Sequence, residues 1–292
     1  MKANKHLFAF IPRPARPSPF PDKFTPYTEN LYKFFTPLGE LTGMKLLVIS
    51  DLHLGNGDIF GTFGWDFNRF IAVLEEIRTG YGIDKVVING DLYELYKYKY
   101  DDVVASSKPL LDYFAKIDCE YIRGNHDFIC EEGKDNLLIE NSRGQKIYIE
   151  HGHNADVLNG TRIGRAVGRA GFSLLKSLIK IPMLREMYFR INSHVDEVDR
   201  IPRKYNSYRY LKYALNLLKT YDVVILGHTH KIEVHKTYYL NQKKRYLNCG
   251  SCTLGRFQAV MLDTETMDYD TIKITSADGT SMMGLERFRK LA

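Results

Sequence analysis

The chain has 292 residues, of which 44% are hydrophobic and 26% charged. This balance is typical of a folded globular protein and excludes a fibrous or wholly disordered chain. No apolar run approaches the roughly 18–20 residues that a membrane-spanning helix needs, and the apolar stretch 7–11 is too short for a secretory signal. Without such a signal, the four cysteines favour a cytoplasmic protein without a disulfide framework.

The positive charge is concentrated in one segment. The chain carries 41 Lys and Arg against 35 Asp and Glu, a net charge of +6. Residues 160–215 alone contain twelve Lys and Arg but only four acids. Anionic partners are therefore expected at this segment.

Residues 1–43 differ from the rest of the chain. They hold seven of the ten prolines, interleaved with aromatic residues. Because proline removes a backbone donor and fixes φ, we expect an extended arm with one short helix at most. Residues 44–292 are expected to form the functional domain, with a helical, basic, lid-like insertion at about 156–220.

From Met44 onward, short apolar runs alternate with helical patterns. In chain order we expect strands at 45–49, 85–89, 120–123 and 223–226, helices at 65–78 and 108–116, a hairpin over 137–150, and antiparallel strands over 232–275. Continuous apolar runs of this length are typical of strands buried on both faces. The alternation predicts an α/β fold built in layers.

Five polar clusters each follow one of these apolar runs. They are Asp51-Leu52-His53, Gly90-Asp91, Gly124-Asn125-His126-Asp127, His151-Gly152-His153 and Gly227-His228-Thr229-His230. Taken singly, each has an ordinary alternative: a hydrogen-bonded histidine at a strand end, a common turn, or a helix cap. Ligands in open α/β sheets gather at the carboxyl ends of the strands, so the five loops are expected to converge.

The side chains of these clusters predict a metal site. Carboxylates, an amide and imidazoles together suit Mn²⁺, Fe or Zn²⁺ better than Ca²⁺, which prefers oxygen ligands. Seven or eight ligands are too many for one tetrahedral zinc. They divide naturally between two ions about 3.5–4 Å apart that share one carboxylate. We therefore expect two divalent ions, with Mn²⁺ first and Fe or Zn²⁺ as alternatives.

The order of these five motifs resembles that of the calcineurin-like metallophosphoesterases, over residues 44 to about 265. The resemblance implies a sandwich of two mixed β-sheets flanked by helices. It also implies that Asp51, His53 and His230 hold one ion, that Asn125, His151 and His228 hold the other, and that Asp91 bridges them. By the same resemblance, His126 lies beside the metals as a catalytic residue and Glu94 orients it. His153 remains open: it would coordinate a metal, bind phosphate or pack.

Three features are similar to the UDP-2,3-diacylglucosamine pyrophosphatase branch of this family. They are the stretch Gly90-Asp91-Leu92-Tyr93-Glu94-Leu95, the basic insertion before the fifth motif, and the Asn248-Cys249-Gly250 strand end. Many of those enzymes have Arg in place of His126, or Asp in place of His153. The resemblance implies a lipid-linked diphosphate substrate covered by a lid. The apolar and basic sides of the insertion also suit contact with a membrane surface, and the alternative is that the apolar side belongs to the core while the basic side faces water. Within the insertion, the candidate substrate contacts are Arg162, Arg165, Arg169 and His194.

Other functions remain as alternatives. The basic residues interleaved with tyrosines in the insertion also suit a nuclease or a nucleotide phosphodiesterase. A non-enzymatic scaffold would be expected to lack some of the ligands, yet all are present. Two further patterns are open: Cys249 and Cys252 are either small buried residues or part of a separate zinc site, and the tyrosines of 93–100 are expected to form a rim near Asp91.

Overall fold

The computed structural model describes residues 41–58, 60–155, 170–171, 183 and 204–275. Most of the predicted arm and most of the predicted insertion therefore lie outside the described residues. Leu41 is buried in the core, and the Oγ1 of Thr42 donates a hydrogen bond to the carbonyl of Glu140 at 3.1 Å. The folded body thus includes residues that precede Met44.

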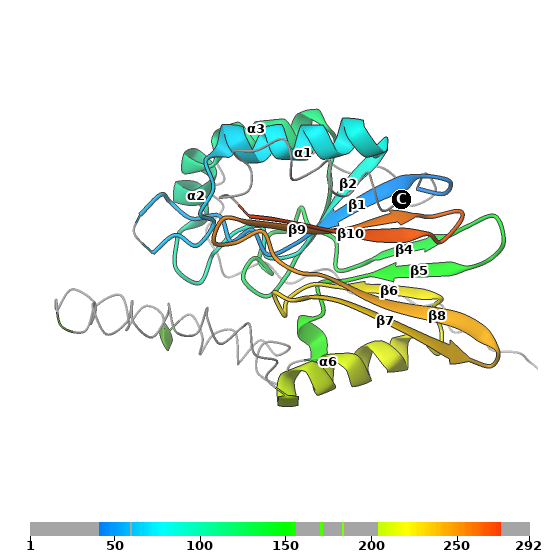
Figure 1. Cartoon of the computed structure of the whole chain (residues 1–292). Coiled ribbons are helices and arrows are strands. Elements are labelled where there is room, and N and C mark those ends of the chain that lie inside the picture. Colours follow the sequence, from blue (N-terminus) through cyan, green and yellow to red (C-terminus); the bar gives the residue numbers. More distant parts are fainter. Residues whose placement is uncertain (1–40, 59, 156–169, 172–182, 184–203, 276–292) are drawn as a thin grey trace, which may run out of the picture. The chain divides into compact units, whose positions relative to one another are not determined.

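Two five-stranded mixed sheets form the centre of the fold (Figure 1). The first has the strand order β10-β9-β1-β2-β3, and the second has the order β4-β5-β6-β8-β7. The strands of the first sheet are β1 (Lys45–Ile49), β2 (Lys85–Asn89), β3 (Glu120–Ile122), β9 (Arg256–Asp263) and β10 (Tyr269–Thr275). Those of the second are β4 (Leu137–Glu140), β5 (Lys146–Ile149), β6 (Val223–Leu226), β7 (Ile232–Tyr239) and β8 (Gln242–Cys249). This arrangement confirms the predicted fold class.

Parallel pairing brings the ends of several strands together. In the first sheet β1 pairs in parallel with β2, and β2 with β3. In the second sheet β6 pairs in parallel with β5 and with β8. The predicted hairpin is β4 with β5, and the predicted antiparallel region is β7 with β8 and β9 with β10.

The continuous apolar strands supply two cores at once. In β1, Leu47 and Ile49 pack toward the helices, whereas Leu46 and Val48 pack between the sheets. This follows from the two-residue period of a strand, which sends alternate side chains to opposite faces. β6 divides in the same way between the inter-sheet core and the core beneath a helix. Full burial of each such side chain contributes about 1.5–3 kcal/mol.

Helices cover the outer faces of both sheets (Figure 1). Their bounds are α1 (Phe67–Tyr81), α2 (Tyr100–Ser106), α3 (Lys108–Lys116) and α6 (Lys204–Leu217), with a short 3₁₀ turn η2 (His153–Ala155). α1 and α3 pack on the first sheet, and α6 packs on the second. α1 begins at an Asp66 cap and ends at Gly82, which has φ +63°. It therefore continues beyond residue 78, where the predicted helix ends, and stops at Gly82, whose left-handed conformation caps it.

The tyrosines of 93–100 were predicted to form a rim near Asp91, and the structure buries most of them instead. The segment forms turns that lead into α2, and Tyr93, Tyr96 and Tyr98 are buried. The Tyr98 hydroxyl donates to Asp58 at 2.5 Å, and the Tyr93 ring packs edge-on against Tyr121. Tyrosine can be buried when its hydroxyl finds a partner, which the alternating pattern could not reveal.

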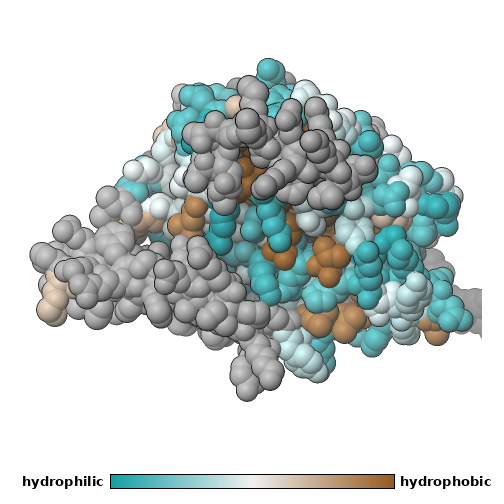
Figure 2. Space-filling view, viewed as in Figure 1, coloured by the Kyte–Doolittle hydropathy of each residue, from teal (hydrophilic) through white to brown (hydrophobic). Residues whose placement is uncertain are grey.

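The surface seen in Figure 2 is mainly hydrophilic over the described residues, with small hydrophobic patches between them. Among the described residues, we find no helix that combines the length and the apolar character required to cross a membrane.

Candidate metal centre

The five predicted clusters meet at one edge of the two sheets. Asp51 and His53 follow β1, Asp91 follows β2, and Asn125 follows β3. His151 follows β5, and His228 and His230 follow β6. The first two loops are tied by backbone bonds from Asp51 to the Gly90 carbonyl at 3.1 Å and from His53 to the Asp91 carbonyl at 2.9 Å. The predicted convergence of strand ends is therefore present.

A first group gathers around Asp51. Its Oδ2 accepts hydrogen bonds from the Ser50 hydroxyl at 2.6 Å and from the His228 backbone N–H at 3.0 Å. Its Oδ1 lies 3.0 Å from His230 Nε2 and 3.7 Å from His53 Nε2. The two imidazole Nε2 atoms are themselves 3.3 Å apart. One carboxylate oxygen and two imidazole nitrogens thus point at a common position.

A second group gathers around Asp91. Its Oδ1 accepts from the His126 backbone N–H at 2.8 Å, which leaves Oδ2 facing His151 Nε2 at 3.1 Å and His53 Nε2 at 3.7 Å. One ligand atom each from Asp91, His151 and His228 lies within 4.8 Å of the other two. Asp91 therefore faces a histidine of the first group as well as those of its own.

A backbone carbonyl fixes the orientation of the His151 ring. Its Nδ1 lies 2.8 Å from the Asn89 carbonyl, which accepts the Nδ1 proton. The other ring nitrogen then points at Asp91. A carbonyl behind the ring is the usual device that selects the nitrogen a metal-binding histidine offers to its ion.

The backbone of the predicted ligands is strained. Asp51, His53, Asp91, His228 and His230 all have φ between 48° and 66°, the left-handed region. Residues other than glycine adopt this region rarely and at a cost of about 1–3 kcal/mol each. Such strain persists where the surroundings enforce it, and it clusters here at the converging side chains.

Two glycines allow the loops to approach one another. A Cβ on Gly90 would lie 2.3 Å from His151 Nδ1, and one on Gly124 would lie 2.1 Å from Asp91 Oδ1. Both distances are far below van der Waals contact. The glycines of the G-D and G-N-H-D motifs therefore make room for the side chains of neighbouring motifs.

The electrostatics of these residues favour a charged carboxylate at Asp51 and charged imidazoles at His53 and His151, but a neutral imidazole at His228. Burial opposes ionisation of Asp51, but His230 and His151 outweigh it and hold the pKa of this carboxyl well below its usual range. Burial also opposes protonation of His53 and His151, yet the facing carboxylates raise their pKa values to about 10 and about 9. Burial, together with the neighbouring His151, lowers the pKa of His228 to about 3.

His126 lies beside these groups, and its ring is held by Glu94 and Tyr96. Its Nδ1 is 2.7 Å from Glu94 Oε1, and its ring lies against Tyr96 with centroids 4.2 Å apart. Glu94 is buried, and its second oxygen lies 3.4 Å from His53 Nδ1 and 3.3 Å from Lys97 Nζ. Burial opposes ionisation of Glu94, but its contacts with His126, His53 and Lys97 keep its pKa well below the usual range. One carboxylate thus contacts both His126 and a predicted ligand.

The structure gives fewer contacts between the two ligand groups and the remaining predicted site residues. His153 is half-buried, with its ring centroid 5.7 Å from that of His151 and 6.5 Å from that of His228. Arg162, Arg165, Arg169 and His194 lie outside the described residues. Cys249 and Cys252 are both buried with free thiols, and neither belongs to a cluster of metal-ligating side chains within the described part of the chain.

Several supporting residues escaped prediction from the sequence. Asp127 is buried and accepts hydrogen bonds from the backbone N–H groups of Gly124 at 2.5 Å and Leu92 at 2.6 Å, so it joins two motif loops. Tyr210 of α6 lies 5.6 Å, ring to ring, from His228. Asp127 stands inside a recognised motif, which was a usable signal. Tyr210 offered none, because its contact spans distant parts of the chain.

The donor set is chemically suited to hold metal ions. Asp51 Oδ1, His151 Nε2 and both amide atoms of Asn125 are buried without a hydrogen-bond partner among the described residues. Such atoms are costly to bury unless something compensates them. Imidazole nitrogens and carboxylate oxygens that crowd within ligand distance are compensated by cations, and the mixture suits Mn²⁺, Fe or Zn²⁺.

Comparison with known proteins identifies the family of the chain. The family model for calcineurin-like phosphoesterases matches residues 44–232. A UDP-2,3-diacylglucosamine hydrolase of Blochmanniella pennsylvanica is 27% identical over 225 residues, which are 67% of this chain and 82% of that protein. A solved structure of a dimetal phosphatase from Danio rerio is 11% identical, covers 80% of this chain and 99% of that one, and has a TM-score of 0.41. A zinc-complexed Vps29 from Entamoeba histolytica is 18% identical, covers 80% of this chain and 99% of that one, and has a TM-score of 0.39. With its five motifs at one sheet edge and a family match over most of its length, the chain belongs to the calcineurin-like phosphoesterases.

Proposed function

We propose that this protein is a dinuclear metal-dependent hydrolase of a phosphoester or pyrophosphate bond. The observation that carries the proposal is the pair of ligand groups that meet at Asp91. Asp51, His53 and His230 form one group, and Asp91 with His151 and His228 forms the other. Asp91 Oδ2 also faces His53 of the first group at 3.7 Å.

In this proposal the residues divide as the family resemblance implies. Asp51, His53 and His230 would hold one ion, Asn125, His151 and His228 would hold the other, and Asp91 would serve both. When bound, two divalent ions supply positive charge that neutralises phosphate oxygens and lowers the pKa of the attacking water. The choice among Mn²⁺, Fe and Zn²⁺ is part of the proposal, with Mn²⁺ placed first.

The residues of the chain do the remaining work. His126 presents Nε2 toward the reacting phosphate because its Nδ1 is held by Glu94 at 2.7 Å. An imidazole so placed donates a hydrogen bond or a proton to the leaving oxygen, which contributes about 10²–10⁴-fold to a rate. Tyr96 packs against the ring and limits its rotation. Glu94 is thus the positioning residue and His126 the catalytic one.

For the substrate, we propose a nucleotide-linked lipid diphosphate of the UDP-2,3-diacylglucosamine type. The relative from Blochmanniella supports it, as does the stretch Gly90–Leu95. The Asn-Cys-Gly strand end has a physical role in the structure: Asn248 Nδ2 donates to the Gly227 carbonyl at 2.8 Å and supports the loop of His228. The histidines at 126 and 153 remain departures from that branch.

A pocket formed by η2, which begins two residues after His151, and by α6 suits a charged and partly apolar substrate. Its volume is about 540 Å³, within the range of small-molecule sites of roughly 300–1,000 Å³. Its lining residues come from η2 and from α6 and its C-terminal end: Asn154, Ala155, Arg209, Lys212, Tyr213, Leu215, Asn216 and Lys219. Three cations stand beside the apolar surface of Leu215 and Tyr213. This pairing also favours our proposal that the protein contacts membranes peripherally.

A nuclease or nucleotide phosphodiesterase is the alternative, favoured by the same three cations. Purified protein with Mn²⁺ is assayed on UDP-2,3-diacylglucosamine in detergent, UDP-glucose, bis(p-nitrophenyl) phosphate and a single-stranded oligonucleotide. We expect the highest kcat/KM for the lipid-linked diphosphate, with release of UMP, and none for Asp91→Ala. A preference for the oligonucleotide that falls steeply with salt would favour the alternative. Absence of turnover on every substrate would contradict the enzyme itself.

A further inference from the structure

A second pocket lies at the other end of the second sheet. Its volume is about 500 Å³. It is formed by four segments: the β4–β5 hairpin turn, the segment between α6 and β6, the start of β8, and the β9–β10 turn. The metal centre follows the carboxyl ends of β5 and β6, whereas this pocket lies at their amino ends. The turns of the hairpins lie together at the right of Figure 1.

Positive charge dominates the lining of this pocket. It contains six basic side chains and one acid: Arg143, Lys146, Lys219, Lys243, Lys244 and Arg245 with Asp222. Figure 2 shows mainly hydrophilic residues at the same end of the molecule. Such a density of like charge is costly unless anions compensate it.

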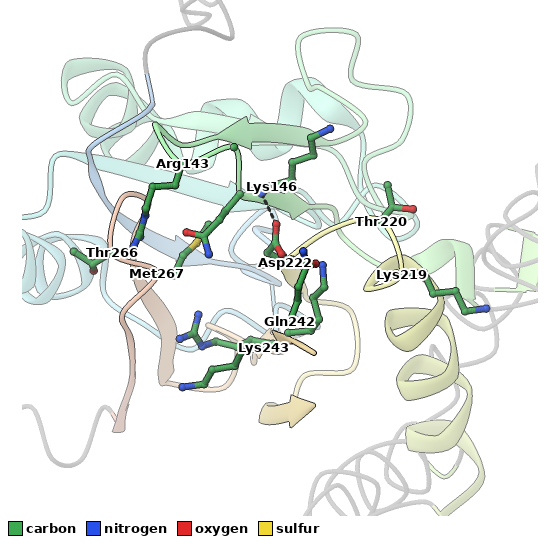
Figure 3. A pocket seen from close by; sticks show the side chains of 13 residues that line it. Arg143, Lys146, Lys219, Thr220, Asp222, Gln242, Lys243, Thr266 and Met267 are labelled. Atoms are coloured by element: carbon green, nitrogen blue, oxygen red, sulfur yellow. Dashed lines mark hydrogen bonds and ion pairs between the residues drawn. The ribbon is translucent and has the colours of Figure 1, made fainter. Parts of the chain in front are cut away.

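Internal acids account for only part of this charge. Asp222 Oδ1 accepts from Lys244 Nζ at 2.9 Å, and Lys146 Nζ lies 3.8 Å from Glu140. In Figure 3 the Lys146 side chain turns away from the pocket, and the Arg143 guanidinium turns to the β9–β10 turn, where it contacts Glu265.

Lys243 and Arg245 are the basic residues of β8 that face no acid, although the Arg245 guanidinium lies over the ring of Tyr269 at 5.7 Å from its centre. Neither forms an ion pair with a described residue, and Lys243 is exposed at the pocket rim. Arg245 is half-buried, and its Nε is fully buried without a hydrogen-bond partner among the described residues. A guanidinium donor in this state lacks the acceptor that buried polar groups normally have. A ligand oxygen in the pocket would supply it.

We propose that this pocket binds a phosphate-type oxyanion with more than one negative charge, such as inorganic pyrophosphate or the phosphates of a soluble nucleotide. A guanidinium pairs with phosphate oxygens by directed hydrogen bonds, and the neighbouring ammonium groups add charge. Because four segments line the pocket, a bound anion would contact both the second sheet and the β9–β10 turn of the first sheet. This site is separate from the proposed catalytic one.

The test is isothermal titration calorimetry of inorganic pyrophosphate into the full-length protein without added metal. We compare the wild type with Lys243→Glu, and use Lys273→Glu, an exposed lysine on β10, as the matched control. We expect one pyrophosphate per chain for the wild type and the control, with affinity that falls as salt rises. Lys243→Glu is expected to bind at least about tenfold more weakly, since it replaces an attractive charge by a repulsive one.

Two further arms complete the experiment. Arg245→Gln is expected to weaken pyrophosphate binding as Lys243→Glu does, with the fold checked by circular dichroism. Turnover of bis(p-nitrophenyl) phosphate by Lys243→Glu is expected to match that of the wild type. Equal pyrophosphate affinity in wild type and Lys243→Glu would overturn the proposal. Binding to phosphatidylglycerol vesicles that Lys243→Glu abolishes, without binding of free pyrophosphate, would assign the pocket to a lipid headgroup and overturn the soluble ligand.

Discussion

Replacing Glu94 by glutamine tests whether this residue positions His126. The buried carboxylate accepts from His126 Nδ1 at 2.7 Å with one oxygen and faces His53 Nδ1 and Lys97 Nζ with the other. An amide keeps the shape but removes the charge, and it presents an N–H₂ group to one of these donors. A hydrogen bond to a charged group contributes about 1.5–3 kcal/mol. At about 1.4 kcal/mol per factor of ten, kcat is expected to fall about 10–150-fold.

The assay compares Glu94→Gln with Glu76→Gln, an exposed acid of α1 that serves as the control. Two phosphodiesters are used, one with a p-nitrophenolate leaving group and one with a poorer alkoxide. If His126 protonates the leaving oxygen, the loss of kcat is larger for the alkoxide in both Glu94→Gln and His126→Ala, while metal content measured by mass spectrometry stays at the wild-type level. An unchanged kcat in Glu94→Gln would refute the positioning role. Loss of metal would show that Glu94 supports the ligand His53 instead.

Three further predictions follow from the same geometry. Asp91→Ala is expected to lower turnover at least about 10³-fold and to reduce metal content, both measured on purified protein, because both ligand groups lose a shared carboxylate. Affinity for Mn²⁺ is expected to rise as the pH increases toward 9–10, and binding is expected to release protons. The reason is that the pKa values of His53 and His151 are raised to about 10 and about 9, so the metal must displace the protons of these imidazoles. Calorimetry in two buffers of different ionisation enthalpy measures the number of protons released. Leu74→Ala removes a fully buried side chain of the helix-side core, and urea unfolding is expected to show a loss of about 2–5 kcal/mol with an unchanged m-value.

The sequence was most informative where a residue's role follows from its place beside a strand. β1 and β6 are short apolar runs, and both were predicted with the bounds that the structure has. Because the carboxyl ends of parallel strands meet at one edge, the position of Asp51, Asp91 and His228 could be expected from order alone. The same reasoning failed for the tyrosines of 93–100, whose alternation arises from buried turns.

Roles that depend on distant contacts could not be read from the sequence. The contact of Glu94 with His53, the ring of Tyr210 near His228 and the segments around Arg245 each join elements that are far apart in the chain. Local pattern carries no information on such pairs. Leu41 is a further example, because a single leucine in a proline-rich region gives no sign that it packs between two sheets.

The central claim is that two cations share the carboxylate of Asp91. Electron paramagnetic resonance of the Mn²⁺-loaded protein, with the bound ions counted on the same sample, tests it most directly. The account predicts two ions per chain and the signal of an exchange-coupled pair, which Asp91→Ala abolishes. A single ion per chain, or two ions that give only the six-line signal of isolated Mn²⁺, would contradict it.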